Sequence, residues 1–345
     1  MVQIGAGGGG GERVVAVQGL TKRFGSLTAV DNLTFTVPPG RVTGFLGPNG
    51  AGKTTTMRML LSLVSPTSGT ATIGGVPYTA LADPLHTVGA SLEATGFHPG
   101  RSGRDHLRVL ATTAGIDHSR ADEVLGLVGL SDAARRRTSQ YSMGMRQRLA
   151  LAAALLGDPD VLLLDEPSNG LDPEGIAWLR GFLRHLAGQG RTILVSSHLL
   201  SEVRQTVDDV VIIRRGKLIR HGSLAELAGD SVALARTPTP ADLVRALGAA
   251  ELRATPGEDG AVRVAGATPA EVGSIAHRAG VELHELRAEE SDLEQIFLEL
   301  TREEAAAGPY GGPPGAPPGA PPGSPYAGPP AAPQQAGASG EGGRA

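Results

Sequence analysis

The sequence predicts an α/β core with an inserted helical lobe, followed by a small α+β module. Apolar runs at 161–164 and 192–196 are typical of strands buried on both faces of a parallel sheet. Residues 101–130 instead space their apolar side chains as helices do. From 231 on, short segments follow the order β-α-β-β-α-β, which is typical of a ferredoxin-like module.

The chain is expected to divide into four parts. We predict a flexible leader over 1–12, an α/β domain over 13–229 with its helical lobe at about 92–157, an accessory module over 231–304, and a tail over 305–345. The tail is rich in Gly, Pro and Ala, so it buries too little apolar surface to fold and should be disordered.

The composition excludes several classes of function. The 345 residues carry a net charge of −4 without any basic block, so nucleic acid is not the expected partner. The absence of cysteine excludes disulfides, thiol catalysis and thiolate metal sites. No stretch approaches the ~20 consecutive apolar residues of a membrane span. We therefore expect that this chain alone does not cross a bilayer.

The N-terminal part consists of short strands and one helix. Phe24 falls on the connection after the first strand, where an aromatic ring is either a plug for a small core or a stacking surface for a purine. The residues alone leave both interpretations open. We predict a helix over 55–63 and strands over 13–18, 27–37, 41–46, 69–73 and 87–91.

A glycine-rich loop lies between the strand at 41–46 and this helix. Its sequence, Gly47-Pro48-Asn49-Gly50-Ala51-Gly52-Lys53-Thr54, matches the phosphate-binding pattern G-x-x-x-x-G-K-[ST]. Glycines let consecutive N–H groups turn toward an anion, Lys53 can reach the β- and γ-phosphates, and Thr54 can ligate Mg²⁺. An ordinary strand–helix turn explains the glycines but not Lys-Thr at this offset. The loop and Thr55 after it are therefore candidate phosphate-binding residues.

Two acidic residues follow the strand at 161–164. Asp165 and Glu166 emerge at its carboxyl end, where ligands bind in open α/β sheets. Paired carboxylates there are costly unless a cation or a reaction uses them. Asp165 is suited to Mg²⁺, and Glu166 to accepting a proton from a water that attacks the γ-phosphate. The alternative, a pair of solvated turn residues, is less favoured beside a phosphate loop.

Three more residues are candidates because of the elements beside them. Ser142 and Gly144 open a helix predicted over 145–156 and offer a hydroxyl and N–H groups to an anion, although a plain N-cap is the simpler interpretation. His198 follows the strand at 192–196 and can meet the γ-phosphate, whereas a lone His is more often structural. The remaining predicted elements of the core are a helix over 174–187 and strands over 210–213 and 218–219.

The C-terminal third carries no catalytic constellation, and a dimer-stabilising or regulatory appendage is the favoured interpretation. We predict strands over 232–236, 251–254, 262–264 and 282–286, and helices over 241–247, 271–278 and 291–303.

With these motifs in this order, the chain from about Val14 to Ala228 resembles the ATP-binding subunit of ABC transporters, which is built on a P-loop NTPase fold. The resemblance implies that the ligands are ATP and Mg²⁺. The roles it implies are adenine stacking for Phe24, the Walker A loop for Gly47 to Thr54, the Walker B carboxylate for Asp165, the catalytic base for Glu166, the switch histidine for His198 and the D-loop for Asn169 to Asp172.

Two positions depart from the family pattern. The signature, usually Leu-Ser-Gly-Gly-Gln, reads Tyr141-Ser142-Met143-Gly144-Met145, which keeps the serine and the second glycine. Glu93 stands where a glutamine is usual; a carboxylate can still ligate Mg²⁺ but cannot donate a hydrogen bond when ionised. Together with Gly96-Phe97-His98-Pro99, these departures resemble the branch that includes bacitracin- and lantibiotic-type exporters. The segment 293–301 likewise resembles the C-terminal extension of ATPases that serve ABC-2-type permeases, a group that includes the daunorubicin-type resistance ATPases.

In this family two copies pair head to tail. The resemblance therefore implies a homodimer or pseudo-dimer in which each ATP lies between the Lys53 loop of one copy and the Ser142–Gly144 turn of the other. It also implies a separate transmembrane permease that holds the ATPase at the cytoplasmic face of the cell membrane and selects the substrate for export.

Two other functions are compatible with a phosphate loop. A soluble ABC-type ATPase acting on ribosomes or DNA usually carries two cassettes or a long coiled-coil insertion, and this chain has neither. A phosphoryl-transfer kinase would need an acceptor pocket, and it leaves Ser142, Gly144 and Asp172 unexplained.

Overall fold

The computed structural model describes residues 13–92, 96–200, 204–228, 232–257 and 259–288. The predicted leader, Glu93, the helix predicted over 291–303 and the tail lie outside the described residues.

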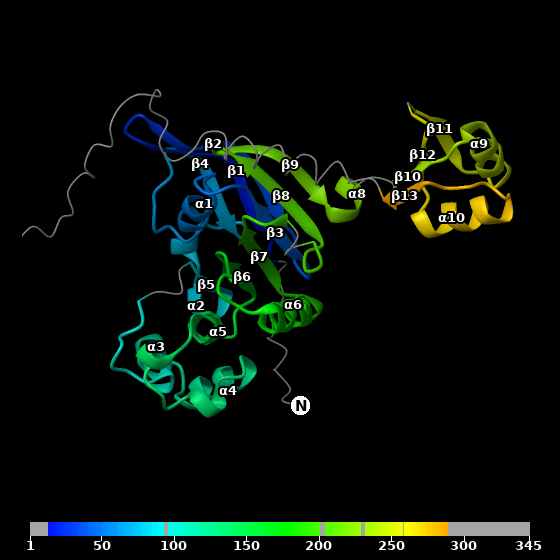
Figure 1. The fold of residues 1–345 in the computed structure, drawn as a ribbon. Coiled ribbons are helices and arrows are strands. Elements are labelled where there is room, and N and C mark those ends of the chain that lie inside the picture. The colour runs from blue at the N-terminus through cyan, green and yellow to red at the C-terminus, as the bar shows by residue number, and fades with distance from the viewer. Residues whose placement is uncertain (1–12, 93–95, 201–203, 229–231, 258, 289–345) are drawn as a thin grey trace, which may run out of the picture. The chain divides into compact units, whose positions relative to one another are not determined.

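A six-stranded sheet forms the centre of the α/β core. Its strands are β3 (Val42–Leu46), β5 (Val88–Ser91), β6 (Val161–Leu164), β7 (Thr192–Ser197), β8 (Asp209–Arg214) and β9 (Lys217–Ser223). They lie in the order β5-β6-β7-β3-β8-β9, all parallel except β9, which pairs antiparallel with β8 (Figure 1). Every residue of β3, β6 and β7 is buried. This burial explains why continuous apolar runs predicted them.

A second, antiparallel sheet has the order β2-β1-β4, with β1 (Val15–Phe24), β2 (Leu27–Val37) and β4 (Ser68–Ile73). The predicted end of the first strand at 18, with Phe24 on a connection, is wrong. The strand continues past an irregularity at Gly19, whose φ is 56°, and pairs Phe24 with Leu27. A left-handed glycine thus bends β1 without ending it.

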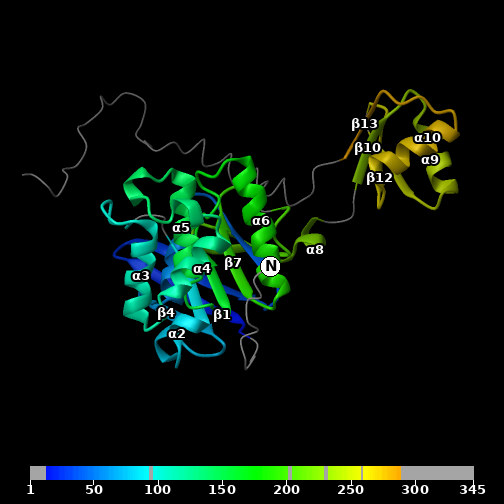
Figure 2. The same ribbon diagram turned by 90° about the horizontal axis from the view of Figure 1, so that it is seen from below.

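Three helices of the core form the predicted helical lobe. These are α3 (Gly103–Ala114), α4 (Ser119–Leu127) and α5 (Met143–Ala154), which pack on one another (Figures 1 and 2). Leu107, Val124 and Leu149 place their side chains in one buried cluster with Leu162 and Leu164 of β6. The lobe and the sheet therefore share a core.

The other described helices of the core follow strands of the two sheets. They are α1 (Lys53–Leu60), α2 (Pro84–Thr87), α6 (Pro173–Gly188) and α8 (Leu224–Ala228), with short 3₁₀ turns at Tyr78–Ala80, Ser131–Ala133 and Thr138–Gln140. Helix α1 follows β3 directly after the glycine-rich loop, and α6 follows β6 after the acidic pair. Both candidate segments thus lie at the carboxyl ends of parallel strands.

The C-terminal module has its own sheet, with strand order β11-β12-β10-β13, all antiparallel. Its elements are β10 (Val232–Arg236), α9 (Pro240–Ala249), β11 (Arg253–Pro256), β12 (Ala261–Ala265), α10 (Pro269–Arg278) and β13 (Glu285–Ala288), which is the predicted β-α-β-β-α-β order. Ala233, Leu243 and Val272 pack in a separate small core. The exact domain boundaries stay predictions.

No helix among the described residues is both long enough and apolar enough to cross a membrane.

Gly89 of β5 tests the packing between the lobe and the sheet. A Cβ at this position would lie 2.0 Å from the Ala154 carbonyl oxygen and 2.7 Å from Cγ of Pro159. Because backbone cannot move aside cheaply, we expect Gly89→Ala to lower the free energy of unfolding by about 1–3 kcal/mol, measured by thermal or urea unfolding.

Gly181 of α6 is the matched control, since a Cβ there meets nothing within 4 Å. Gly181→Ala should raise stability by roughly 0.5–1 kcal/mol, because alanine favours helix over glycine. Equal effects of the two alanines would contradict the close packing at Gly89.

Candidate active site

The glycine-rich loop between β3 and α1 approaches other backbone so closely that two of its glycines have no substitute. A Cβ at Gly47 would lie 2.4 Å from the carbonyl oxygen of Ile213, and one at Gly52 would lie 2.6 Å from that of Ala29. Gly52, the N-cap of α1, also has a φ of 107°. The loop therefore curls tightly over the N-terminus of a helix, which is a favourable place for an anion.

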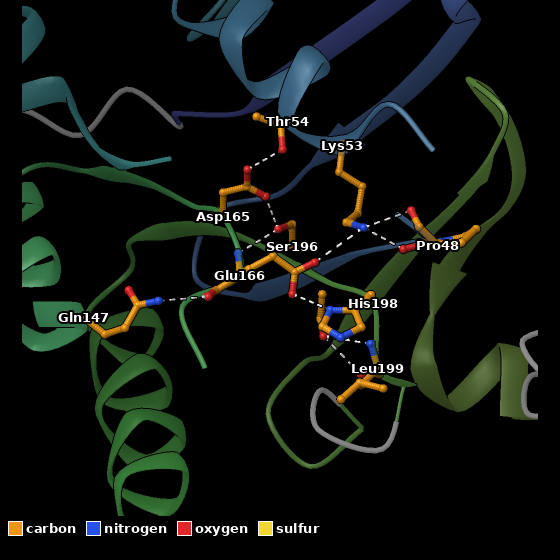
Figure 3. Close-up of polar contacts among 11 residues, drawn as sticks. Pro48, Lys53, Thr54, Gln147, Asp165, Glu166, Ser196, His198 and Leu199 are labelled. Carbon is orange, nitrogen blue, oxygen red and sulfur yellow. Dashed lines mark hydrogen bonds and ion pairs between the residues drawn. The ribbon is translucent and has the colours of Figure 1, made fainter. Parts of the chain in front are cut away.

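Lys53 lies at the first position of α1, and only 6% of it is exposed. Its Nζ donates to the carbonyl oxygens of Gly47 (2.6 Å) and Pro48 (3.2 Å) and lies 3.4 Å from Oε1 of Glu166 (Figure 3). A buried ammonium needs such partners, because its desolvation is costly. Lys53 and Glu166 are 113 positions apart in the sequence, and this contact brings them into one site.

Asp165 follows β6 and faces the phosphate loop. The hydroxyl of Thr54 donates to Oδ2 of Asp165 at 2.5 Å, and the hydroxyl of Ser196 donates to Oδ1. The Asp165 N–H donates to the carbonyl oxygen of Ser91 at 2.8 Å. A hydroxyl and a carboxylate therefore lie side by side.

Glu166 has a left-handed backbone, with a φ of 48°. This conformation is uncommon outside glycine and typical of functional sites when the surroundings hold it in place. Its N–H donates to Ser196 Oγ at 2.9 Å, and its carbonyl oxygen accepts from Gln147 Nε2 at 3.4 Å. Its side-chain Oε2 lies 2.8 Å from Nδ1 of His198 (Figure 3). The carboxylate is thereby held between Lys53 and His198.

Sequence reasoning missed two residues of this group, Ser196 and Gln147. Ser196 is fully buried near the end of β7, after the apolar residues 193–195, and it contacts both residues of the acidic pair. Its signal was a hydroxyl in a buried strand two positions before His198. Gln147 gave no local signal, because its contact depends on how α5 packs beside the segment that follows β6.

Ser142 and Asp172 cap helices instead of joining the group around Lys53. Ser142 is the N-cap of α5, where its hydroxyl accepts from Met145 N–H at 3.2 Å. Asp172 is the N-cap of α6 and accepts from Gly175 N–H at 2.8 Å. Gly144 lies in the first turn of α5, beside residues 170 and 171. These three predicted residues form a second group, at two helix N-termini.

Tyr141 fixes the position of this second group on the lobe. Its hydroxyl donates to the carbonyl oxygen of Ala133 at 2.8 Å, and its side chain packs on Gly103, where a Cβ would lie 2.3 Å from the hydroxyl. Burial raises the pKa of Tyr141 above its usual value. The phenol therefore stays protonated and keeps its hydrogen bond at neutral pH.

Phe24 lies at the end of β1 and is 49% exposed. Its ring has the Lys22 ammonium 4.9 Å from its centroid. A half-exposed ring is compatible with base stacking and is too exposed to plug a core.

Two segments of the chain match known protein-family models. Residues 30–169, which include the phosphate loop and the acidic pair, match the model described as "ABC transporter". Residues 231–294 match a domain of unknown function, DUF8746.

The bacitracin transport ATP-binding protein BcrA of Enterococcus faecalis is 42% identical over 219 residues, which cover 63% of this chain and 71% of that protein. This chain belongs to the ATP-binding subunits of ABC transporters. As a member of this family it binds and hydrolyses ATP. The soluble non-transport alternative is not favoured by these relatives.

Two other comparisons agree with the membership in the ABC family. The daunorubicin/doxorubicin resistance ATP-binding protein DrrA of Streptomyces peucetius is 38% identical, covering 62% of this chain and 67% of that protein. A solved dimeric ATP-binding cassette in a post-hydrolysis state, bound to ADP and phosphate, has a TM-score of 0.56 at 23% identity and covers 61% of this chain and 99% of that one. The second likeness supports the ABC fold.

Ser196→Ala tests the hydroxyl that holds the acidic pair. The change frees Asp165 Oδ1 and leaves the N–H of Glu166 without its partner, so the carboxylates lose their fixed positions. We expect ATP hydrolysis to fall by roughly tenfold or more, since small misplacements of reacting groups are costly. A phosphate-release assay measures this loss.

Thr43→Val is the control for this prediction. Thr43 is a fully buried hydroxyl on the neighbouring strand β3, and its Oγ1 has no hydrogen-bond partner among the described residues. Removing it should leave hydrolysis unchanged. A similar loss in both variants would mean that any change inside the sheet impairs hydrolysis.

Proposed function

We propose that this chain is the ATPase subunit of an exporter for antibiotic-like or other drug-like compounds. The arrangement of Lys53, Glu166 and His198 at the carboxyl edge of the parallel sheet is the observation that carries the ATPase site. The names of the relatives, which include bacitracin transport and daunorubicin resistance, support the export of such compounds.

The phosphates of ATP would bind in the glycine-rich loop. The N–H groups at the start of α1 would donate to phosphate oxygens. The Lys53 ammonium would exchange its present carbonyl partners for phosphate oxygens. Thr55 lies in the first turn of this helix and would also bind the phosphates. Phe24, at the end of β1, would stack on adenine. The nucleotide-binding residues of one copy are then Phe24, Gly47, Pro48, Asn49, Gly50, Ala51, Gly52, Lys53, Thr54 and Thr55.

Hydrolysis needs a base beside the γ-phosphate. A water attacks the γ-phosphorus, the bond to the bridging oxygen breaks, and its electron pair stays on ADP, while Glu166 takes the proton of the water. His198 contacts the Glu166 carboxylate through its Nδ1 and would meet the γ-phosphate. Lys53 offsets the negative charge of the transferred group.

The donors at Thr54 and Asp165 fit Mg²⁺. They are hard oxygen atoms, 2.5 Å apart, and Mg²⁺ in such sites is bound by one or two carboxylates together with substrate phosphates. When bound, the ion would neutralise charge on the β- and γ-phosphates. Glu93, the third proposed ligand, lies outside the described residues.

A second copy would complete each site. Ser142, Gly144 and Asp172 lie at the N-termini of α5 and α6, where N–H groups and a hydroxyl can meet the γ-phosphate bound to the other copy. A solved cassette of the same fold is dimeric, which supports the pairing of two copies. ATP would close the pair, and loss of the γ-phosphate would open it.

The coupled partner would be a separate transmembrane permease, which the names of the transport ATP-binding relatives support. The ATPase would then bind to the cytoplasmic face of the cell membrane through that permease. The C-terminal module would stabilise the dimer or regulate it, and no nucleic acid is needed as a partner.

Glu166→Gln tests the catalytic base. The amide keeps the size of the side chain but cannot accept a proton, so we expect turnover to fall by about 100-fold or more, the range removed with a general base. ATP should still bind, and the dimer should live longer with ATP, as seen by size-exclusion chromatography. Unchanged hydrolysis would exclude Glu166 as the base.

Lys53→Ala tests the phosphate loop. Loss of the ammonium removes charged hydrogen bonds to phosphate, so affinity for a fluorescent ATP analogue should fall by about 10- to 100-fold. Lys217→Ala is the control. Lys217 lies on the edge strand β9 and forms an exposed ion pair with Asp31 of β2. If Lys53→Ala bound the analogue as tightly as Lys217→Ala does, the loop would not be the phosphate site.

A further inference from the structure

Met143 packs directly on a glycine of another segment. Residues 169–172 form a loop, the 169–172 loop, which follows Glu166 and leads into α6. A Cβ built on Gly170 of this loop would lie 2.4 Å from Cγ and 2.5 Å from Sδ of Met143. With the Met143 side chain in this conformation, only a residue without a Cβ fits at position 170. Met143 is nevertheless 59% exposed.

The neighbouring residue of α5 takes part in the same contact. A Cβ at Gly144 would lie 3.3 Å from the carbonyl oxygen of Gly170 and 3.4 Å from Cδ2 of Leu171. One turn further along, Gln147 donates to the carbonyl oxygen of Glu166. Met143 and Gln147 are four residues apart and share a helix face. This face of α5 therefore contacts the segment after β6 at Glu166, Gly170 and Leu171.

A glycine, the usual residue of the family signature at this position, has no side chain to place on Gly170. Methionine supplies three heavy atoms beyond Cβ and adapts its shape to an uneven surface. Gly170 has a φ of 76°, so the loop presents its bare Cα to the thioether in a conformation that other residues rarely adopt. The departure Met143 and the glycine at 170 thus form one complementary pair.

We propose that Met143 is a positioning residue of the ATPase. Its side chain fastens the 142–144 turn to the 169–172 loop, so that the two segments offered to a second copy keep one fixed relative geometry. The inference rests on the proposed two-copy site. It adds a residue, Met143, and a contact within one chain on which the assembly of that site depends.

The first test compares Met143→Ala with Met143→Leu in the full chain. Alanine removes the atoms that touch Gly170 and favours the helix, whereas leucine keeps the volume. For Met143→Ala we expect the protein concentration at half-maximal specific ATPase activity to rise by roughly tenfold, the size of coupling expected between residues in contact. Met143→Leu should stay within about twofold of the wild type.

Two readouts separate positioning from a general loss of structure. Met143→Ala should bind a fluorescent ATP analogue with wild-type affinity as a monomer, because the Lys53 loop is untouched, and it should keep its melting temperature. Val109→Ala serves as the control, since Val109 is an exposed apolar residue of α3, 43% accessible, away from the 169–172 loop.

A double-mutant cycle with Gly170→Ala tests the contact itself. In the wild-type background this alanine meets Met143 and also strains the backbone, whereas in the Met143→Ala background only the strain remains. Gly170→Ala should therefore cost roughly tenfold less activity when Met143 is already alanine. Additive effects would overturn the proposal.

The possible failures are distinguishable. If the wild-type chain shows no concentration-dependent ATP hydrolysis, the two-copy site is wrong and the inference fails with it. If the wild type shows it and Met143→Ala behaves like Met143→Leu, the two-copy site stands and Met143 has no positioning role.

Discussion

The buried ammonium of Lys53 is the charge around which the site is arranged. An ion that is only 6% exposed must be compensated, and here it is held by Gly47, Pro48 and Glu166. These partners require the loop to curl back over α1, and they require β6 to end at the same edge of the sheet as β3, with only β7 between them. The parallel order β6-β7-β3 brings the strand ends to one edge of the sheet, where the two groups meet.

The left-handed backbone of Glu166 is the second constraint. It is maintained by neighbours from two other elements, Ser196 of β7 and Gln147 of α5. Because this strain is supported from outside the segment, the carboxylate can point between Lys53 and His198. Helix α5 belongs to the lobe, and its residue Gln147 helps to hold the backbone of Glu166, the proposed base.

Helix α5 also links the two groups of candidate residues. Its N-cap, Ser142, belongs to the turn proposed to face a second copy, while Gln147 reaches the segment of the chain's own base. The 169–172 loop lies against the same helix face. Packed atoms of α5 therefore connect the two groups of candidate residues within one chain.

The sequence by itself determined the phosphate loop, the acidic pair and the buried strands, because each depends on residues that are adjacent in the chain and on apolar runs that fit only a covered sheet. It misjudged β1, since a bulge at Gly19 carries the strand on to Phe24. Only the tertiary structure decided which groups meet. Ser196, Gln147 and Met143 act on residues distant in sequence, and strand order and helix packing, which no local pattern encodes, bring them together.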